Sequence, residues 1–403
     1  MYQLQPEVIS DRATAVGDSI TLRIGALAKQ MKAEGKDVLS FSQGEPDFDT
    51  PESIKSAGIE AIQQGKTKYT AASGIPQLKQ AIITKLQRDQ GLDYQEHNIV
   101  VSCGAKHSIF NAHMALINPG DEVIIPAPYW VSYPDQVLLA GGVPVIVNTS
   151  MASGFKISPE QLQQAVTQKS KIVILCTPSN PTGMMYSEAE LRALAEVIVQ
   201  NNLVVYSDEI YEKLAYGNNR HFSIAQVSDE LKARTIVING VSKAYAMTGW
   251  RIGYMAAASG IAKAVNKIQA QSTSNPVTAS QWASIEALNN TEHQVQTMTA
   301  AFAQRRDFMV AALNGIPGIE CLMPDGAFYA FPSIQSFLGK RSASGKLLDS
   351  ASFCKNLLQE QNIATVPGSG FGAEGFIRLS YSTSMAEIEE GIERMGQWLK
   401  TLT

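Results

Sequence analysis

The sequence predicts an α/β protein whose larger part holds a mostly parallel sheet covered by helices on both faces. Between residues 45 and 290, short continuous apolar runs alternate with segments of helical periodicity. Apolar runs without polar alternation are typical of parallel strands that are buried on both faces. After residue 290, helical segments surround only short strands, which indicates a smaller α+β unit. We therefore expect a large domain, 45–290, and a small domain that joins 1–44 to 291–403.

The expected elements follow one another in chain order. Strands of the larger part are expected at 98–102, 122–126, 143–147, 171–177, 203–209 and 235–239. Helices are expected there at 52–64, 75–89, 106–117, 187–201 and 259–290. Later in the chain we expect helices at 296–313, 350–360 and 385–401, strands at 327–331 and 376–380, and an exposed loop at 338–348.

Composition and charge argue against several classes of protein. The chain has 403 residues, 45% hydrophobic and 17% charged, with a net charge of −4. That charge gives no basic field for nucleic acid or anionic lipid, and no apolar run reaches membrane-spanning length. The cysteines lie far apart and the histidines lack metal-ligand spacing, so we expect neither a disulfide framework nor a metal. Without the apolar core of a signal peptide at the N-terminus, we expect a cytoplasmic protein.

Loops at the carboxyl ends of parallel strands are the usual place for ligands. The first such loop, Gly104-Ala105-Lys106, opens a helix, and the free N–H groups of a helix start bind anions. A plain strand–helix turn explains the same residues. The next loop, PAPYWVSYP (126–134), carries aromatic side chains that suit either ring stacking or core packing, namely Tyr129, Trp130 and Tyr133.

The loops after the next two strands add an amide, a carboxylate and a phenol. In TPSNPTG (177–183), proline turns present Asn180 rigidly, although such turns are common. In SDEIYE (207–212), Asp208 follows an apolar run, and a buried carboxylate needs a cationic partner. That partner is either a ligand or a structural salt bridge. Tyr211 lies three residues on, where it can face the same cavity.

The segment GVSKAYAMTGWRIGY (240–254) places two cations, Lys243 and Arg251, among apolar residues. Burying a cation costs several kcal/mol unless the cation is paired or loses its charge. A ligand with a phosphate, an aromatic ring and a cationic ring nitrogen accounts for all of these loops. Arg251 and the helix start bind its phosphate, Trp130 stacks on the ring, and Asp208 pairs with the nitrogen. Lys243 condenses with an aldehyde, which is the pattern of pyridoxal phosphate.

Over almost its whole length the chain resembles the class I aminotransferases of the fold-type I pyridoxal-phosphate enzymes. The motifs that carry the resemblance are QGEPDFDTP (43–51), KYTAASGIPQLKQAI (68–82), PSNPTG (178–183), SDEIYE (207–212), SKAYAMTGWRIG (242–253), PGSGFG (367–372) and IRLSY (377–381). They stand in the family's order and spacing. The phrases GEPDFDTP and PYWVSYP are most similar to the bacterial aspartate aminotransferase subgroup, to which the prephenate aminotransferases also belong.

The resemblance implies how pyridoxal 5'-phosphate is held. Lys243 forms a Schiff base with it, and Asp208 keeps the ring nitrogen protonated. Tyr211 and Asn180 bond the ring's phenolic oxygen, and Trp130 stacks on the ring. The phosphate is held by Arg251, Ser242 and the backbone of Gly104, Ala105 and Lys106. Tyr69 reaches the phosphate of the neighbouring subunit, which implies a homodimer with shared sites.

The resemblance also implies a substrate site. Arg378 and Asn180 bind the α-carboxylate of the substrate, and the Gly44 backbone and Trp130 lie beside it. Arg378 also suits this role because its fork-shaped cation matches a carboxylate. The chain departs from the best-studied aspartate aminotransferases in its phosphate loop, and no arginine occurs between Arg251 and Arg305 to bind a distal carboxylate. The subgroup resemblance assigns that carboxylate to Lys106.

The implied activity is ping-pong transamination between an L-amino acid, expected to be aspartate or glutamate, and a 2-oxo acid such as 2-oxoglutarate or oxaloacetate. A prephenate or aromatic aminotransferase stays open, as does a β-lyase or an aminocyclopropane-carboxylate synthase on the same cofactor. The glycines of PGSGFG suggest a nicotinamide-dependent dehydrogenase, but they do not open a helix after an early strand. A cofactor-binding transcription regulator would need a DNA-binding domain before the QGEPDF motif, where there is too little room.

Overall fold

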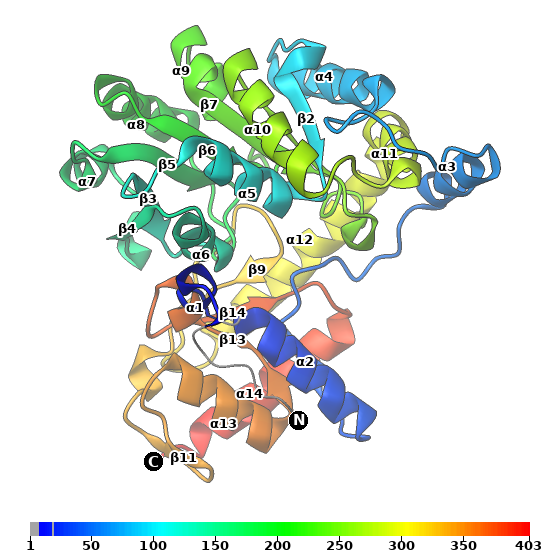
Figure 1. Cartoon of the computed structure of the whole chain (residues 1–403). Helices are drawn as coiled ribbons and strands as arrows, with labels where there is room; N and C mark the ends of the chain where they lie inside the picture. The colour runs from blue at the N-terminus through cyan, green and yellow to red at the C-terminus, as the bar shows by residue number, and fades with distance from the viewer. Residues whose placement is uncertain (1–7, 18–19) are drawn as a thin grey trace.

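The computed structural model describes residues 8–17 and 20–403 of the chain (Figure 1). Its α-helices are α1 (Asp11–Thr14), α2 (Ile20–Ala33), α3 (Glu52–Gln63), α4 (Pro76–Gln90), α5 (Ala105–Leu116), α6 (Ser132–Leu139), α7 (Pro159–Ala165), α8 (Glu188–Gln200), α9 (Asp229–Arg234), α10 (Ser259–Ser272), α11 (Thr278–Asn290), α12 (Glu292–Asn314), α13 (Ser350–Gln361) and α14 (Met385–Lys400). Its strands are β1 (Leu39–Ser40), β2 (Ile99–Ser102), β3 (Glu122–Ala127), β4 (Val143–Asn148), β5 (Ser170–Cys176), β6 (Val204–Asp208), β7 (Thr235–Gly240), β8 (Gly253–Ala256), β9 (Tyr329–Ala330), β10 (Arg341–Ser342), β11 (Gly345–Lys346), β12 (Ile363–Ala364), β13 (Val366–Pro367) and β14 (Ile377–Ser380).

A seven-stranded sheet forms the centre of the larger part, in the order β2-β8-β7-β6-β5-β3-β4. The strands from β7 to β4 run parallel, whereas β8 runs antiparallel to both of its neighbours. The predicted mostly parallel α/β fold is confirmed. Sequence reasoning missed β8, because its short run begins at Gly253, directly after a loop-like motif.

Helices cover both faces of this sheet, and neighbouring residues of one strand pack on opposite faces. In β5, Ile172 and Ile174 belong to the apolar cluster that includes residues of α5, α6 and α10. Val173 and Leu175 belong to the cluster formed with α7, α8 and α9. The strands are therefore buried on both sides, which explains their continuous apolar runs.

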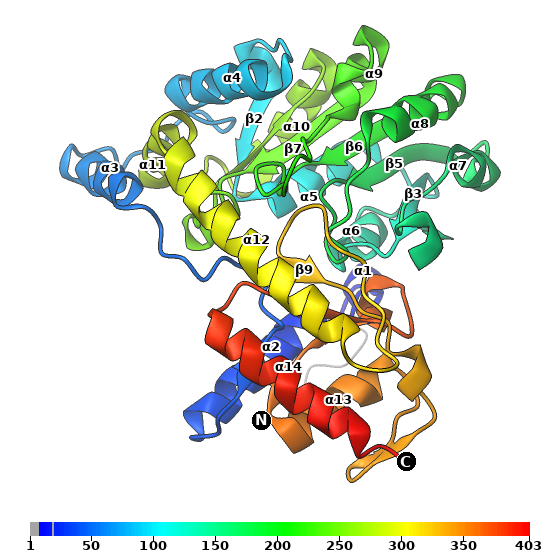
Figure 2. The same cartoon turned by 180° about the vertical axis from the view of Figure 1, so that it is seen from behind.

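The smaller part packs at one end of the sheet and holds the sheet β13-β14-β9 with α13 and α14 (Figure 1). The strand β1 pairs in parallel with β12, so residues 39–40 lie beside residues 363–364. The long helix α12 runs from the end near α11 to α14 (Figure 2). The domain limits 45–290 and 1–44 with 291–403 stay a prediction.

Two of the expected segments take a different form in the structure. The helix expected over 259–290 is broken between α10 and α11, where Ser274 has a φ of 59° and Pro276 follows. A left-handed residue and a proline both interrupt helical hydrogen bonding. The loop expected at 338–348 forms the hairpin β10–β11, and Leu347 is buried while Leu348 stays exposed. Within the described ranges, no helix is long and apolar enough to cross a membrane.

Candidate active site

A cavity of 740 Å³ lies where β5, β6 and β7 end and α5 begins. Side chains from both parts of the molecule line it. Of the residues proposed from the sequence, it brings together Gly44, Ala105, Lys106, Trp130, Asn180, Asp208, Tyr211, Ser242, Lys243, Arg251 and Arg378. Gly104 lies immediately beside it, and Tyr69 lies outside it. A cavity of this size holds a cofactor-sized ligand together with a small substrate.

Lys243 follows β7, and its side chain contacts the backbone of a segment far away in the sequence. Its ammonium group donates a short hydrogen bond to the carbonyl oxygen of Gly44. Burial lowers the pKa of Lys243 to about 8, and the cations Arg251 and Arg378 act in the same direction. Because of this lowered pKa, a sizeable fraction of the amine is neutral near physiological pH. A neutral lysine amine serves as a nucleophile and as a base.

Asp208 ends β6, is 4% exposed, and receives hydrogen bonds from uncharged donors only in the described part of the chain. The hydroxyl of Tyr133 donates to Oδ2 at 2.6 Å, and the N–H of Ile210 lies 3.3 Å from Oδ1. Burial raises the pKa of Asp208 to about 6. Within the described residues no cation forms an ion pair with this carboxylate, although the charge of Lys243 lowers its pKa slightly. A ring with a protonated nitrogen fits it.

Arg378 is a buried cation with no carboxylate as its hydrogen-bond partner in the described part of the chain. Its Nη1 donates to Oδ1 of Asn180 at 2.9 Å, and its Nη2 donates to the Ser42 carbonyl at 2.8 Å. Its Nε is buried without a described partner. The guanidinium carbon lies 4.4 Å from the ring centroid of Tyr329. Burial lowers the pKa of Arg378, and a carboxylate in the cavity would relieve this cost.

Tyr211, which follows β6, contacts Tyr329 of β9 in the smaller part of the molecule. Their hydroxyl oxygens lie 2.8 Å apart. Both rings are fully or almost fully buried, so each hydroxyl stays where the surrounding side chains hold it. Two phenols and the Asn180 amide therefore offer hydrogen bonds to a polar substituent of a bound ring.

Arg251 lies against the start of α5 and forms an anion-binding cradle with it. Its Nη1 donates to the Thr248 carbonyl at 2.7 Å, and its Nη2 approaches the Cys103 carbonyl at 3.3 Å. Gly104 has a φ of 91°, and a Cβ there would lie 2.3 Å from Arg251 Nη2. Only glycine allows this approach. The first N–H groups of a helix lack intrahelical acceptors and bind anions.

Lys106 and Trp130 lie next to each other in the lining of the cavity. The Lys106 ammonium lies 4.9 Å from the ring centroid of Trp130. Burial lowers the pKa of Lys106, and the charge of Arg251 lowers it further, while Asp135 opposes both effects. A further anion beside Lys106 would raise its pKa again.

Sequence reasoning gave no role to several residues that take part in the site. Tyr133 was named only as one of three aromatic side chains, and the structure shows that it bonds Asp208. Tyr329 comes from the short strand AFYAF, and Glu45 follows Gly44 in the motif QGEPDF. The helix α2 also contributes Lys29 to the lining. No local pattern marks these contacts, because each depends on how distant segments pack.

Comparison with known proteins agrees with this geometry. The chain belongs to the aminotransferase class I and II family, whose sequence profile matches residues 36–395. It is 50% identical to an aspartate aminotransferase of Bacillus sp. (strain YM-2), over 98% of this chain and 100% of the relative. It is 46% identical to an aspartate/prephenate aminotransferase of Nitrosomonas europaea, over 97% of this chain and 99% of the relative.

A solved structure agrees as well. The crystal structure of the aspartate aminotransferase from Rhizobium meliloti superimposes with a TM-score of 0.95 at 45% sequence identity, and the match covers all of both chains. The fold and the family together make this chain an aminotransferase.

Proposed function

We propose that this aminotransferase uses pyridoxal 5'-phosphate and exchanges an amino group between aspartate or glutamate and a 2-oxo acid. The observation that carries the proposal is the meeting of Lys243, Asp208 and Arg378 in one cavity. The amine has a lowered pKa, and among the described residues the carboxylate forms no ion pair with a cation and the guanidinium none with a carboxylate. A cationic ring and an amino acid complement these groups.

The residues of the cavity fit the proposed cofactor. Its phosphate would lie at Arg251, Ser242 and the N–H groups of Gly104, Ala105 and Lys106. Its ring would lie between Trp130, Asp208, Tyr211 and Asn180. When bound, pyridoxal phosphate supplies an aldehyde for the amino group and a protonated ring that withdraws electrons from the substrate's Cα.

Lys243 and Asp208 would each control a different proton. The neutral amine of Lys243 would take the proton from the substrate's Cα and return it to the C4′ carbon of the cofactor, and a base with a pKa near the working pH does this best. Asp208, once ionised beside a cation, holds the proton at the ring nitrogen. The two half-reactions use the same groups in turn, first with an amino acid and then with a 2-oxo acid.

Arg378 and Lys106 would hold the two ends of a dicarboxylic substrate. The free Nε edge of Arg378, with Asn180 beside it, suits the α-carboxylate. Lys106 lines the same cavity near Trp130, where a distal carboxylate would gain a charge-assisted hydrogen bond. The Gly44 carbonyl accepts a hydrogen bond from the Lys243 ammonium group, and the Gly44 backbone would lie beside the substrate.

We also propose that two chains pair, with Tyr69 completing the site of the partner subunit. Tyr69 is 91% exposed and takes no part in the cavity of its own chain. The nearby surface supports pairing, because apolar side chains of α3 and of the turn before α11 are exposed: Ile59, Ile62 and Val277. All four cysteines are free, which supports the proposed cytoplasmic location.

A second candidate is prephenate as the amino acceptor, which the similarity to the Nitrosomonas europaea protein supports. One panel of amino donors and 2-oxo acids, including prephenate, tests both candidates by the change in the cofactor's absorption spectrum. We expect aspartate and glutamate to convert the bound cofactor fully to its aminated form. Release of ammonia and a 2-oxo acid without an acceptor would instead indicate a lyase, and conversion by neutral donors alone would contradict the aspartate assignment.

A further inference from the structure

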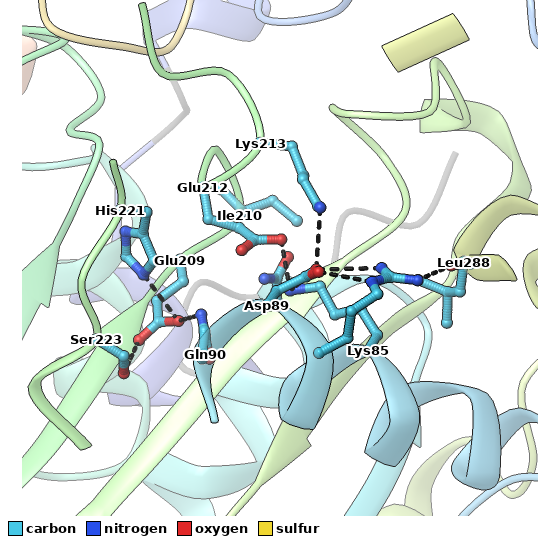
Figure 3. A network of polar contacts seen from close by, with 12 residues as sticks. Lys85, Asp89, Gln90, Glu209, Ile210, Glu212, Lys213, His221, Ser223 and Leu288 are labelled. Carbon is cyan, nitrogen blue, oxygen red and sulfur yellow. Dashed lines mark hydrogen bonds and ion pairs between the residues drawn. The ribbon is translucent and has the colours of Figure 1, made fainter. Parts of the chain in front are cut away.

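A network of buried polar contacts joins the C-terminal end of α4 to the segment that carries Asp208 and Tyr211 (Figure 3). We call it the α4 network. Its members are Lys85, Asp89, Gln90, Ser207, Glu209, Glu212, Lys213, His221 and Ser223. None of them lines the cavity. The mechanism proposed above does not use these groups, so their burial needs another explanation.

Glu209 is the centre of one half of the α4 network. Its carboxylate is fully buried and has a partner on each side. Its Oε2 accepts a hydrogen bond from Gln90 Nε2 at 2.7 Å and lies 3.0 Å from His221 Nε2. Its Oε1 accepts from the hydroxyls of Ser207 at 2.7 Å and Ser223 at 2.5 Å. Both carboxylate oxygens are thus fixed by groups from separate segments.

Lys85 is the centre of the other half. Its side chain is 1% exposed, and its ammonium lies 2.5 Å from Glu212 Oε1 and 3.8 Å from Asp89 Oδ2. Asp89 in turn lies 3.0 Å from the ammonium of Lys213. The turn after β6 is therefore tied to α4 by two ion pairs, one from Glu212 and one from Lys213.

Each half of the network contains a direct sequence neighbour of a residue that faces the cavity: Glu209 follows Asp208, and Glu212 follows Tyr211. Consecutive residues of an extended chain point to opposite sides. Asp208 accordingly bonds Tyr133 of α6, whereas Glu209 bonds Gln90 of α4 on the other side. Tyr211 lies one residue before Glu212. Any displacement of Glu209 or Glu212 must therefore move the backbone that aims Asp208 and Tyr211.

Fold stability alone is a poor explanation for such a network. Replacing a buried ion pair by apolar residues of similar volume is often neutral or stabilising, because both charges lose hydration when they are buried. Hydrogen bonds and ion pairs do, however, fix the orientation of the groups that they join. The charges persist here: although burial opposes it, Glu212 raises the pKa of Lys85, and His221 with the two serines lowers the pKa of Glu209.

We propose that the α4 network is a positioning device, which holds Asp208 and Tyr211 in place for the ring of the cofactor from the side away from the cavity. Its members are positioning residues, since they touch neither cofactor nor substrate. This inference rests on the proposed function and adds to it the source of the site's rigidity.

The test replaces both members of the buried ion pair by apolar residues in the double variant Lys85→Met/Glu212→Leu. Four quantities are measured: the thermal midpoint of the cofactor-free protein, the dissociation constant for pyridoxal phosphate, the visible absorption of the loaded protein against pH, and the kinetic constants. Small misplacements of reacting groups cost up to about 100-fold in rate. We expect kcat to fall about 10- to 100-fold, weaker cofactor binding, and a shifted absorption titration.

Two further results separate positioning from a merely structural role. The thermal midpoint should stay unchanged or rise, and KM for the amino acid should change by less than about threefold, because Arg378 lies outside the network. The control variant, Lys171→Met/Asp121→Asn, removes an ion pair of 2.6 Å near the amino-terminal ends of β5 and β3, outside the cavity. It should leave kcat, cofactor binding and the absorption spectrum unchanged.

A loaded double variant with wild-type kcat, cofactor affinity and absorption would overturn the proposal. If the double variant does not fold, Gln90→Leu removes a single donor to Glu209 and should lower kcat and cofactor affinity in the same direction. Wild-type values in that variant would also overturn the proposal. Failure of the wild-type protein itself to bind pyridoxal phosphate is a different result, because it contradicts the proposed function and the positioning role together.

Discussion

The hydroxyl of Tyr133 donates a hydrogen bond of 2.6 Å to Oδ2 of Asp208, and so joins α6 to the end of β6. Both groups are almost completely buried. Burial raises the pKa of Asp208, and this hydrogen bond partly offsets the effect. Tyr133 therefore helps Asp208 to stay ionised when a cationic ring is bound.

Replacing Tyr133 by phenylalanine should raise the pKa of Asp208 further and weaken its hold on a protonated ring. A hydrogen bond to a charged group contributes about 1.5–3 kcal/mol, so kcat should fall roughly 10- to 150-fold. The control is Tyr129→Phe, which removes a hydroxyl from the same loop. Equal kinetic constants for Tyr133→Phe and wild type would show that Asp208 does not need this bond.

Asp208 should make the stability of the cofactor-free protein depend on pH. Its folded pKa of about 6 exceeds the ordinary value of 3.8, so the folded state keeps a proton that the unfolded chain has lost. Stability therefore falls as pH rises from about 4 to 6 and stays lower above that range. The cost reaches up to about 3 kcal/mol, because one pKa unit corresponds to about 1.4 kcal/mol.

Asp208→Asn should remove this cost. We expect a higher thermal midpoint than wild type for the cofactor-free variant at pH 8, and a smaller difference at pH 5. The loaded variant should behave in the opposite way, with a strongly reduced kcat, because the ring nitrogen loses its counter-charge. A cofactor-free variant that is less stable than wild type at pH 8, or near-normal turnover when fully loaded, would contradict the role of Asp208.

Lys106→Ala should change the choice of substrate. A charge-assisted hydrogen bond to a distal carboxylate contributes about 1.5–3 kcal/mol, or roughly 10- to 150-fold in kcat/KM. That loss is expected with aspartate and glutamate, and a much smaller one with alanine and phenylalanine. Lys29→Ala, at a further lysine that lines the cavity, is the control. A uniform loss with all donors would show that Lys106 serves the phosphate alone.

Hybrid dimers test the proposed sharing of sites. Lys243→Ala and Tyr69→Ala proteins, each impaired alone, should regain part of the wild-type activity when they are mixed and their subunits exchange. A hybrid contains one site with neither substitution only if Tyr69 serves the partner's site. Exchange shown independently by mass, with no gain in activity, would mean that each site is built from one chain.

Much of the fold was predictable because its strands are buried on both faces. The centres of the runs 171–177 and 235–239, namely 172–176 and 236–238, are purely apolar, and such runs are typical of strands in a covered parallel sheet. β8 was missed because an antiparallel insertion between β2 and β7 depends on long-range pairing. The break between α10 and α11 arises from the backbone of Ser274 together with Pro276.

The candidate site was predictable where one residue type carries the chemistry. Lys243, Asp208 and Arg251 are charges in apolar surroundings, so each one needs a ligand or partner. Tyr133 and the α4 network were not predictable in this way. A tyrosine in an aromatic loop can form a hydrogen bond with many different groups, and the sequence does not show which. The contact of Glu209 with Gln90 joins residues 119 positions apart, which no local pattern reveals.

The central claim, that Lys243 is the amine that binds the cofactor covalently, has a direct test. Protein loaded with pyridoxal phosphate is treated with borohydride, digested and mapped by mass spectrometry. The low pKa of Lys243, about 8, and its place in the cavity predict that the added mass lies on the peptide containing Lys243. Attachment to Lys263 or Lys267 of α10, or no attachment at all, would contradict the account.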